Sequence, residues 1–236
     1  MAETDSQSVQ AGFPIRGWLA ECGAEFRHEF LELGRPKSFS AGGVIYRTDD
    51  ATAELFGIIS GVVTVQCRFA HPDAVLLHLL WPGEWFGGQD LLAGRSRRYT
   101  TVARTDVELL RVPGDEVRAL LQRHPEGVAK LARNSVYGLD LAMQTASDLL
   151  IPDASERCAA TLLRLADRRW ATGPHGNLPS EIPAASQTEL AMLCNVSRKT
   201  FSRVIGDFSR RRLVTVGYRS LTVHDPAQLR IVADSG

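Results

Sequence analysis

The stretch SQTELAMLCNVSRKTFSRVIGDFSRRR, residues 186–212, carries the signals of two short helices around a tight turn. Ser186 is followed three residues later by Glu189, and this pattern predicts a capping box at the start of the first helix. Asn195 tolerates the positive φ of a tight turn, and Ser197 predicts the N-cap of the second helix. We therefore expect a helix-turn-helix here.

The second helix of this stretch combines an apolar face with a basic face. Apolar side chains recur at i, i+3, i+4 and i+7 and so lie on one side, as Phe201, Val204, Ile205 and Phe208. Basic and hydroxyl side chains occupy the other side, and such a face fits the major groove, where Arg and Lys donate to guanine. The alternative is a charged face that contacts only water. The agreement of caps, turn, apolar stripe and basic first turn favours DNA binding.

A β-wing is predicted after the second helix, because LVTVGYRSLTV, residues 213–223, reads as strand, turn and strand. Tyr218 and Arg219 at its tip are candidate phosphate contacts, although hairpin tips also carry polar residues for solubility. The full set of residues that we expect at DNA is Thr188, Arg198, Lys199, Ser202, Arg203, Arg212, Tyr218 and Arg219.

The charge distribution places this DNA-binding role in the C-terminal part. The 236 residues are 44% hydrophobic, which suffices for two modest cores. Residues 152–236 hold 12 Lys plus Arg against 8 Asp plus Glu, whereas residues 1–151 hold 15 against 19. The formal net charge of zero therefore divides into +4 and −4. Only the C-terminal part suits a polyanion.

The cysteines and histidines predict no metal site. Cys22, Cys67, Cys158 and Cys194 are scattered, without the close spacing of a zinc or iron–sulfur site, so we expect free thiols. The histidines form no closely spaced ligand set. No apolar run approaches the ~18 residues of a membrane span, and the first residues lack a signal-peptide core. We expect a cytoplasmic protein with no membrane partner.

The chain is predicted to have an α+β fold whose N-terminal half is dominated by a jelly-roll β-sandwich. Residues 16–33 have helical apolar spacing, and short alternating runs separated by glycine-bearing turns follow. So many closely spaced short strands indicate a jelly roll. The expected strands are residues 39–46, 54–59, 61–67, 74–81, 99–103 and 107–112.

A long helix is predicted over residues 125–150, with apolar residues three and four apart like the seam of a two-stranded coiled coil. A second stripe with Val128 and Leu131 faces another way and is expected to pack on the sandwich; the alternative is a helix buried within its own subunit. Pro152 ends the helix, a new helix covers about 155–169, and 172–183 form a surface loop. The predicted dimer seam is Ala132, Val136, Leu139, Met143, Ala146 and Leu150.

In this order the chain resembles the Crp/Fnr superfamily of bacterial transcription regulators along nearly its whole length. LFGIISGVVTV (55–65) is similar to the family's glycine-marked strand pair, and NVSRKTFSRVIGDF (195–208) to its recognition helix. WFGGQDLL (85–92) with RRYTTVART (97–105) resembles its phosphate-binding cassette. The resemblance implies a cyclic-nucleotide-binding-like sensor (16–124), a dimerisation helix (125–151) and a winged helix-turn-helix domain (152–236).

The resemblance also implies partners. Its members bind two-fold related half-sites, so we expect double-stranded DNA with a pseudo-palindromic site, a second copy of the chain, and RNA polymerase. Many relatives carry Glu at the second position of the recognition helix, where this chain has Lys199. We therefore expect a half-site that differs from the familiar one.

The cassette is a candidate anion site. Gly87 and Gly88 allow backbone amides to approach a phosphate, and Arg98 is the arginine predicted to pair with it; the alternative for Arg98 is an internal salt bridge. Cyclic-AMP-binding relatives carry Glu after the second glycine and a small hydroxyl residue after the arginine, where this chain has Gln89 and Tyr99.

The long helix departs from the cyclic-AMP pattern as well, with Ala142 and Met143 where those relatives offer Thr and Ser to the adenine. Because a nucleotide would leave polar groups unpaired here, the sequence favours a different small ligand, or none; no cofactor is assigned. Three alternatives stay open: a cyclic-nucleotide-responsive regulator, a jelly-roll enzyme with a C-terminal interaction module, and a ligand-binding protein without DNA activity.

Overall fold

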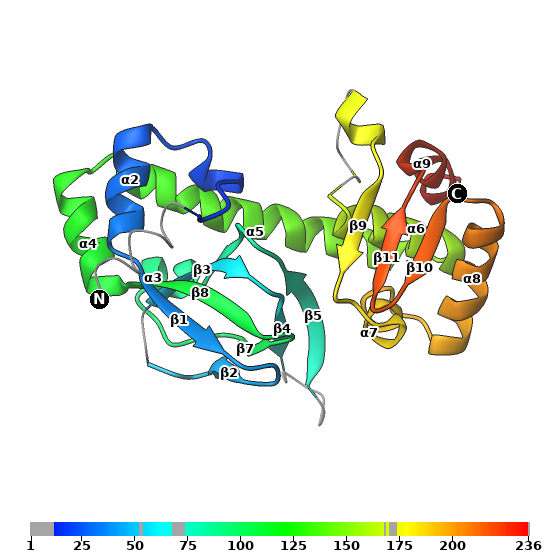
Figure 1. The fold of residues 1–236 in the computed structure, drawn as a ribbon, viewed down its shortest axis with the longest axis horizontal. Coiled ribbons are helices and arrows are strands. Elements are labelled where there is room, and N and C mark those ends of the chain that lie inside the picture. Colours follow the sequence, from blue (N-terminus) through cyan, green and yellow to red (C-terminus); the bar gives the residue numbers. More distant parts are fainter. Residues whose placement is uncertain (1–11, 52–53, 68–73, 168, 170–173, 236) are drawn as a thin grey trace. The chain divides into compact units, whose positions relative to one another are not determined.

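The computed structural model describes residues 12–51, 54–67, 74–167, 169 and 174–235. The chain divides into two compact units, Met1–Asp140 and Leu141–Gly236 (Figure 1). The division falls inside α5 (Gly127–Leu150), which contributes residues to both units. Within the described part of the chain, no helix combines the length and apolar composition that a bilayer span requires.

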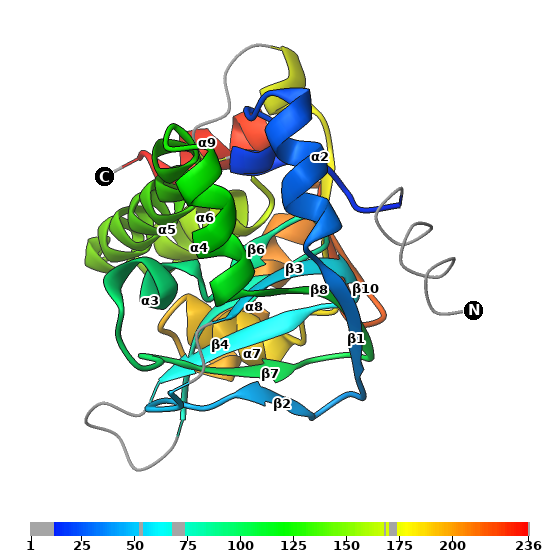
Figure 2. The ribbon, with the colours of Figure 1, turned by 90° about the vertical axis from the view of Figure 1, so that its left-hand side faces the viewer.

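The first unit is a β-sandwich, as predicted. One antiparallel sheet has the strand order β1-β8-β3-β6 and the other β2-β7-β4-β5. Figure 2 shows them as two layers. The strands are β1 (Arg35–Phe39), β2 (Val44–Tyr46), β3 (Glu54–Ser60), β4 (Val63–Cys67), β5 (Val75–Leu80), β6 (Trp85–Phe86), β7 (Thr100–Ala103) and β8 (Val107–Pro113).

Two details of the strands differ from the sequence prediction. The single strand expected over 39–46 is two strands in different sheets, because the chain turns at Gly42, where φ is +83°. β6 was not predicted, because two residues are too few to show a period. It nevertheless positions the cassette, because its two residues are the first two of WFGGQDLL.

The sandwich has one core between its sheets and another under its helices. The core between the sheets includes Tyr46, Phe56 and Phe86. The second core lies between the β1-β8-β3-β6 sheet and a group of helices, and it includes Leu110 of β8. Figure 2 shows these helices above this sheet, on the side away from the other sheet. These helices are η1 (Gly17–Leu19), α2 (Ala24–Glu32), α4 (Gly114–Arg123) and the start of α5; α3 (Gly88–Ala93) follows β6.

The helix predicted over 16–33 is therefore interrupted, and α4 was not predicted. Gly17 has a φ of +58° at the start of η1, and Gly23 is the non-helical N-cap of α2. On α5, Leu131 of the second stripe is buried in the first unit, whereas Val128 is exposed. The helix ends at Leu150, as predicted from Pro152.

The second unit is a small winged-helix domain. Its helices are α6 (Ala154–Leu165), η2 (Pro174–Asn177), α7 (Gln187–Leu193), α8 (Arg198–Arg210) and α9 (Pro226–Ala233). Its sheet has the order β10-β11-β9, formed by β10 (Val214–Gly217), β11 (Ser220–Val223) and β9 (Ser180–Pro183).

The segment predicted as a surface loop, 172–183, instead contains η2 and β9. β9 pairs with β11, and buried Ile182 lies opposite buried Leu221. This pairing joins segments far apart in the sequence, so no local pattern indicated it. The C-terminal α9 was not predicted either; Asp225 caps it, Pro226 opens it, and it packs against α6.

Candidate nucleic-acid interface and sensor cassette

The caps of the two helices of the motif confirm the sequence prediction. The Ser186 hydroxyl accepts a hydrogen bond from the Glu189 amide at 3.2 Å, and Glu189 accepts from the Ser186 amide at 2.9 Å. Asn195 has a φ of +51° in the turn, and the Ser197 hydroxyl accepts from the Thr200 amide at 3.0 Å. These local bonds fix where α7 and α8 begin.

The apolar stripe of α8 anchors it and leaves its basic side exposed. Phe201, Val204, Ile205 and Phe208 are all buried. On the opposite side Arg198, Lys199, Ser202 and Arg203 are exposed, as is Thr188 on α7. A Cβ built on Gly206 would meet nothing within 4 Å, so this side of α8 is open.

The cations on α8 divide into a paired and an unpaired group. Arg210 and Arg211 lie 3.1 and 3.7 Å from the carboxylate oxygens of Asp207. In contrast, Arg198, Lys199 and Arg203 make no salt bridge with any described residue. The first turns of α8 therefore present cations that are not neutralised at contact distance.

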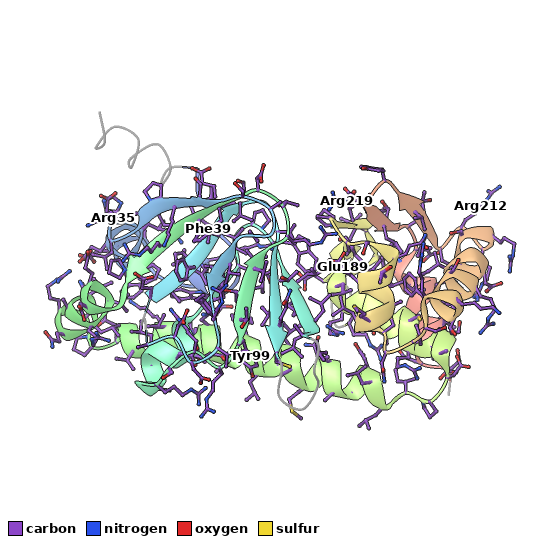
Figure 3. The ribbon with its side chains drawn as sticks, turned by 90° about the horizontal axis from the view of Figure 1, so that it is seen from below. Arg35, Phe39, Tyr99, Glu189, Arg212 and Arg219 are labelled. Atoms are coloured by element: carbon purple, nitrogen blue, oxygen red, sulfur yellow. The ribbon has the colours of Figure 1, made fainter. Side chains whose placement is uncertain are left out.

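The wing and the end of α8 supply three further exposed side chains. Tyr218 is 93% exposed at the turn between β10 and β11, next to exposed Arg219. Figure 3 shows Arg219 on the wing and Arg212 after α8, well apart from each other. All eight residues predicted at DNA are thus exposed in one unit, and their contacts with DNA stay a prediction.

The buried arginine of the sensor cassette is Arg97, and the phosphate contact expected of Arg98 stays a prediction. Arg97 is 1% exposed, whereas Arg98 is exposed. The terminal nitrogens of Arg97 donate to the carbonyl oxygens of Gly87 at 2.8 Å and of Glu54 at 2.5 Å. Its guanidinium also lies 3.9 Å from Asp90 Oδ2. The internal role considered for Arg98 therefore belongs to its neighbour.

The glycines of the cassette are needed for this packing. Gly87 has a φ of +86°, and a Cβ there would lie 2.7 Å from both the Arg97 guanidinium and the Glu54 carbonyl oxygen. A Cβ on Gly88 would lie 2.8 Å from the side chain of Leu55. The first glycine thus admits the arginine, in addition to any approach of a ligand.

Aromatic rings line the inner side of the cassette. The Arg97 guanidinium lies 4.2 Å from the ring centroid of Tyr46, a cation–π contact. Tyr46 contacts Phe56 and Phe86, with ring centroids 6.1 and 5.9 Å apart. Burial raises the pKa of Tyr46 to about 12, against the opposing effect of Arg97.

The remaining predicted effector residues do not form one cluster within a unit. Gln89 is exposed and Tyr99 half-buried in the first unit. Ala142 and Met143 are exposed on the part of α5 in the second unit. Among the described residues, no three His, Cys, Asp or Glu side chains are grouped to hold a metal ion, and the four cysteines are free and buried.

The turn of the helix-turn-helix is held by an arginine that the sequence reasoning did not single out. Arg157 of α6 donates through Nε to the carbonyl oxygen of Cys194 at 2.9 Å. Its Nη1 donates to the carbonyl oxygens of Ile151 and Pro152, between α5 and α6. No sequence signal distinguishes Arg157 from other helix arginines.

Two domain families match this chain. Residues 36–124 match the cyclic nucleotide-binding domain, and residues 156–231 match the Crp-like helix-turn-helix domain. The transcriptional regulator SdrP of Thermus thermophilus is 28% identical over 200 residues, covering 84% of this chain and 94% of SdrP. The CRP-like cAMP-activated global transcriptional regulator of Mycobacterium tuberculosis is 26% identical over 195 residues, covering 83% and 86% of the two chains.

Solved structures have the same fold. The crystal structure of a CRP/FNR-family transcriptional regulator from Thermus thermophilus aligns with a TM-score of 0.61 at 28% identity, covering 85% of this chain and 98% of that one. FixK2 from Bradyrhizobium japonicum aligns with a TM-score of 0.72 at 19% identity, covering 86% and 98%. At that identity the likeness concerns the fold alone.

Proposed function

The chain belongs to the Crp/Fnr superfamily of transcription regulators, and we propose that it binds a pseudo-palindromic DNA site as a homodimer controlled by a small ligand other than cyclic AMP. Because its relatives are transcriptional regulators, the jelly-roll enzyme considered from the sequence is rejected. The protein acts in the cytoplasm, where it meets DNA and RNA polymerase.

The exposed basic side of α8 is the observation that carries the proposal for DNA. Its apolar stripe is buried, and Arg198, Lys199 and Arg203 have no salt-bridge partner among the described residues. Desolvating these cations against guanine or phosphate breaks no existing ion pair. The same exposed helix argues against a ligand-binding protein without DNA activity.

Selection of genomic DNA fragments tests this part. We expect enrichment of a two-fold symmetric sequence, with binding that weakens steeply between about 50 and about 200 mM salt. Failure to enrich any sequence, or binding that ignores salt, would contradict a sequence-specific regulator.

The proposed dimer seam lies along exposed apolar residues of α5. Val136, Leu139, Met143 and Leu150 are 55%, 61%, 64% and 81% exposed, and Ala132 and Ala146 separate them with small side chains. A heptad-spaced apolar stripe of this kind is stabilised by a second identical helix. A two-fold dimer would present two α8 helices to two half-sites.

A charge substitution on the seam tests the dimer. Leu139→Lys should convert a dimer into monomers at micromolar concentration, measured by sedimentation or light scattering, because it buries a charge in an apolar interface. Asp140→Lys, at the adjacent exposed position, is the matched control and should remain dimeric. A monomeric unsubstituted protein would refute the homodimer.

The cassette supports a ligand other than cyclic AMP. The Arg97 donors already serve the Gly87 and Glu54 carbonyl oxygens, and the carboxylate of Asp90 lies beside them. A phosphate at Arg97 would compete with two carbonyl acceptors for the terminal nitrogens and would approach a carboxylate. This competition at Arg97 supports a ligand other than a cyclic nucleotide.

Thermal unfolding with cyclic AMP tests this directly. A ligand at 100 times its Kd would stabilise the folded protein by about 2.7 kcal/mol. Because we propose that cyclic AMP does not bind, we expect a high concentration of it to leave the melting temperature unchanged. A clear rise would overturn the proposal. Mass spectrometry of small molecules carried by the purified protein then identifies the actual effector.

A further inference from the structure

Asp148 is a buried carboxylate on an otherwise exposed stretch of α5. It is 2% exposed, although residues 146–147 and 149–150 on both sides of it are exposed. A buried charge is costly unless it is compensated. Its partner is Arg164 of α6, whose Nε donates a hydrogen bond to Asp148 Oδ2 at 2.7 Å, with both side chains buried.

The ion pair extends into a network that includes the end of the chain. Arg169, after α6, has its Nε 3.8 Å from Asp148 Oδ1. Its Nη1 donates to Asp234 Oδ1 at 2.8 Å, just after α9. One carboxylate of α5 is thus connected to three parts of the winged-helix domain.

This pair adds little to the free energy of unfolding, but it restricts the orientation of α5 relative to α6. Both terminal nitrogens of Arg164 are buried without a hydrogen-bond partner among the described residues. Apolar side chains of similar volume often stabilise a fold equally well in place of a buried ion pair. Unlike apolar contacts, the hydrogen bond is directional, so it restricts how the end of α5 lies on α6.

The connection between α5 and α6 is held as well. Asp153 caps α6, and Arg157 binds the carbonyl oxygens of Ile151 and Pro152 while it also binds that of Cys194 in the helix-turn-helix. The last residues of α5 and the DNA-binding helices therefore belong to one cross-linked body, in agreement with the compact unit Leu141–Gly236.

We propose that the buried Asp148–Arg164 pair is a positioning device that sets the separation of the two DNA half-sites which a dimer of this chain accepts. The proposal rests on the dimer and the DNA binding proposed above. The same segment of α5 carries the seam residues Met143, Ala146 and Leu150, so the pair transmits the geometry of the seam to α8. One inserted base pair moves a half-site by about 3.4 Å and rotates it by about 35°.

The test compares affinity for DNA of different half-site spacing. The site selected by the unchanged protein is resynthesised with one or two base pairs added or removed, and each Kd is measured, together with that for a single half-site. The double variant Asp148→Leu with Arg164→Met has apolar side chains of similar volume but lacks the directional hydrogen bond. We expect its preference for the selected spacing to fall by about tenfold, with single half-site affinity unchanged.

The controls separate positioning from folding. Asp234→Ala removes only the exposed end of the network and should keep the original spacing preference. If the double variant does not fold, Asp148→Glu retains the charge with a longer side chain and should shift or weaken the preference. An unchanged spacing preference in a folded, dimeric variant overturns the inference. Lack of dimers or of selected DNA with the unchanged protein refutes the proposed function instead.

Discussion

Cationic side chains in the two units of this protein are used in opposite ways. In the first unit Arg97 is buried, and its terminal nitrogens bind the carbonyl oxygens of Gly87 and Glu54. In the second unit Arg198, Lys199 and Arg203 are exposed and make no salt bridge with a described residue. The sequence motif around each group suggests anion binding, yet the terminal nitrogens of Arg97 already have carbonyl acceptors, whereas the cations of the second group have no ion-pair partner among the described residues.

An arginine in an anion-binding motif therefore binds a ligand only if its donors are available. A buried guanidinium with backbone acceptors holds loops together. An exposed guanidinium on a rigid helix can exchange water for a base or a phosphate. We accordingly expect substitutions of arginine to affect stability in the first unit and DNA binding in the second.

The largest expected effect is that of Arg97→Ala. Removing the guanidinium leaves the two buried carbonyl groups without their donor, although Arg95 still lies 3.2 Å from the carboxylate of Asp90, so the first unit should lose about 3 to 5 kcal/mol. Urea unfolding followed by tryptophan fluorescence measures this, because Trp18 and Trp85 are buried in that unit. Arg98→Ala is the matched control and should change stability by less than about 0.5 kcal/mol. Equal effects would mean that Arg97 does not hold the cassette.

The second prediction concerns alkaline pH. The pKa of Tyr46 is about 12 in the folded protein and 10.0 ordinarily, so the unfolded chain loses this proton first. The protonated Tyr46 hydroxyl therefore contributes its full share to the free energy of unfolding below pH 10. This contribution is lost as the pH rises towards 12, up to about 3 kcal/mol in total. Tyr46→Phe keeps the ring beneath Arg97 and should reduce this loss in urea unfolding across that pH range. A loss of the same size in both proteins would contradict it.

The different burial of the adjacent Arg97 and Arg98 shows what could and could not be predicted from the sequence. The caps, turn and stripe of the helix-turn-helix were predicted because their signals are local. The burial of Arg97 was not predicted, although Thr101 and Ala103 of β7 are buried and their alternating pattern, extended backwards along the chain, reaches Arg97. The pairing of β9 and the burial of Asp148 depend on segments far apart in the sequence, and no local period reports them.

The third prediction addresses the exposed cations of the second unit. Arg203→Ala should reduce discrimination between the selected DNA site and an altered one by about 1 to 3 kcal/mol, as loss of a bidentate base contact would. Arg210, on the same helix, is already paired with Asp207, so Arg210→Ala is the control and should leave discrimination unchanged. Competition binding with both DNAs measures the difference. If both substitutions reduce discrimination equally, availability of donors is not what distinguishes these arginines.

The smallest expected effect lies on the wing, and it separates phosphate binding from base reading. Arg219 has a φ of +55°, so Arg219→Asn is the suitable substitution, since Asn tolerates this backbone conformation. A lost phosphate contact should weaken binding to all sequences alike and reduce the slope of log affinity against log salt by about one. Arg219→Lys keeps the charge and should keep the slope. If Arg219→Asn instead changes the sequence preference and leaves the salt slope constant, Arg219 contacts a base edge. The contrast between base contacts by α8 and phosphate contacts by the wing would then fail.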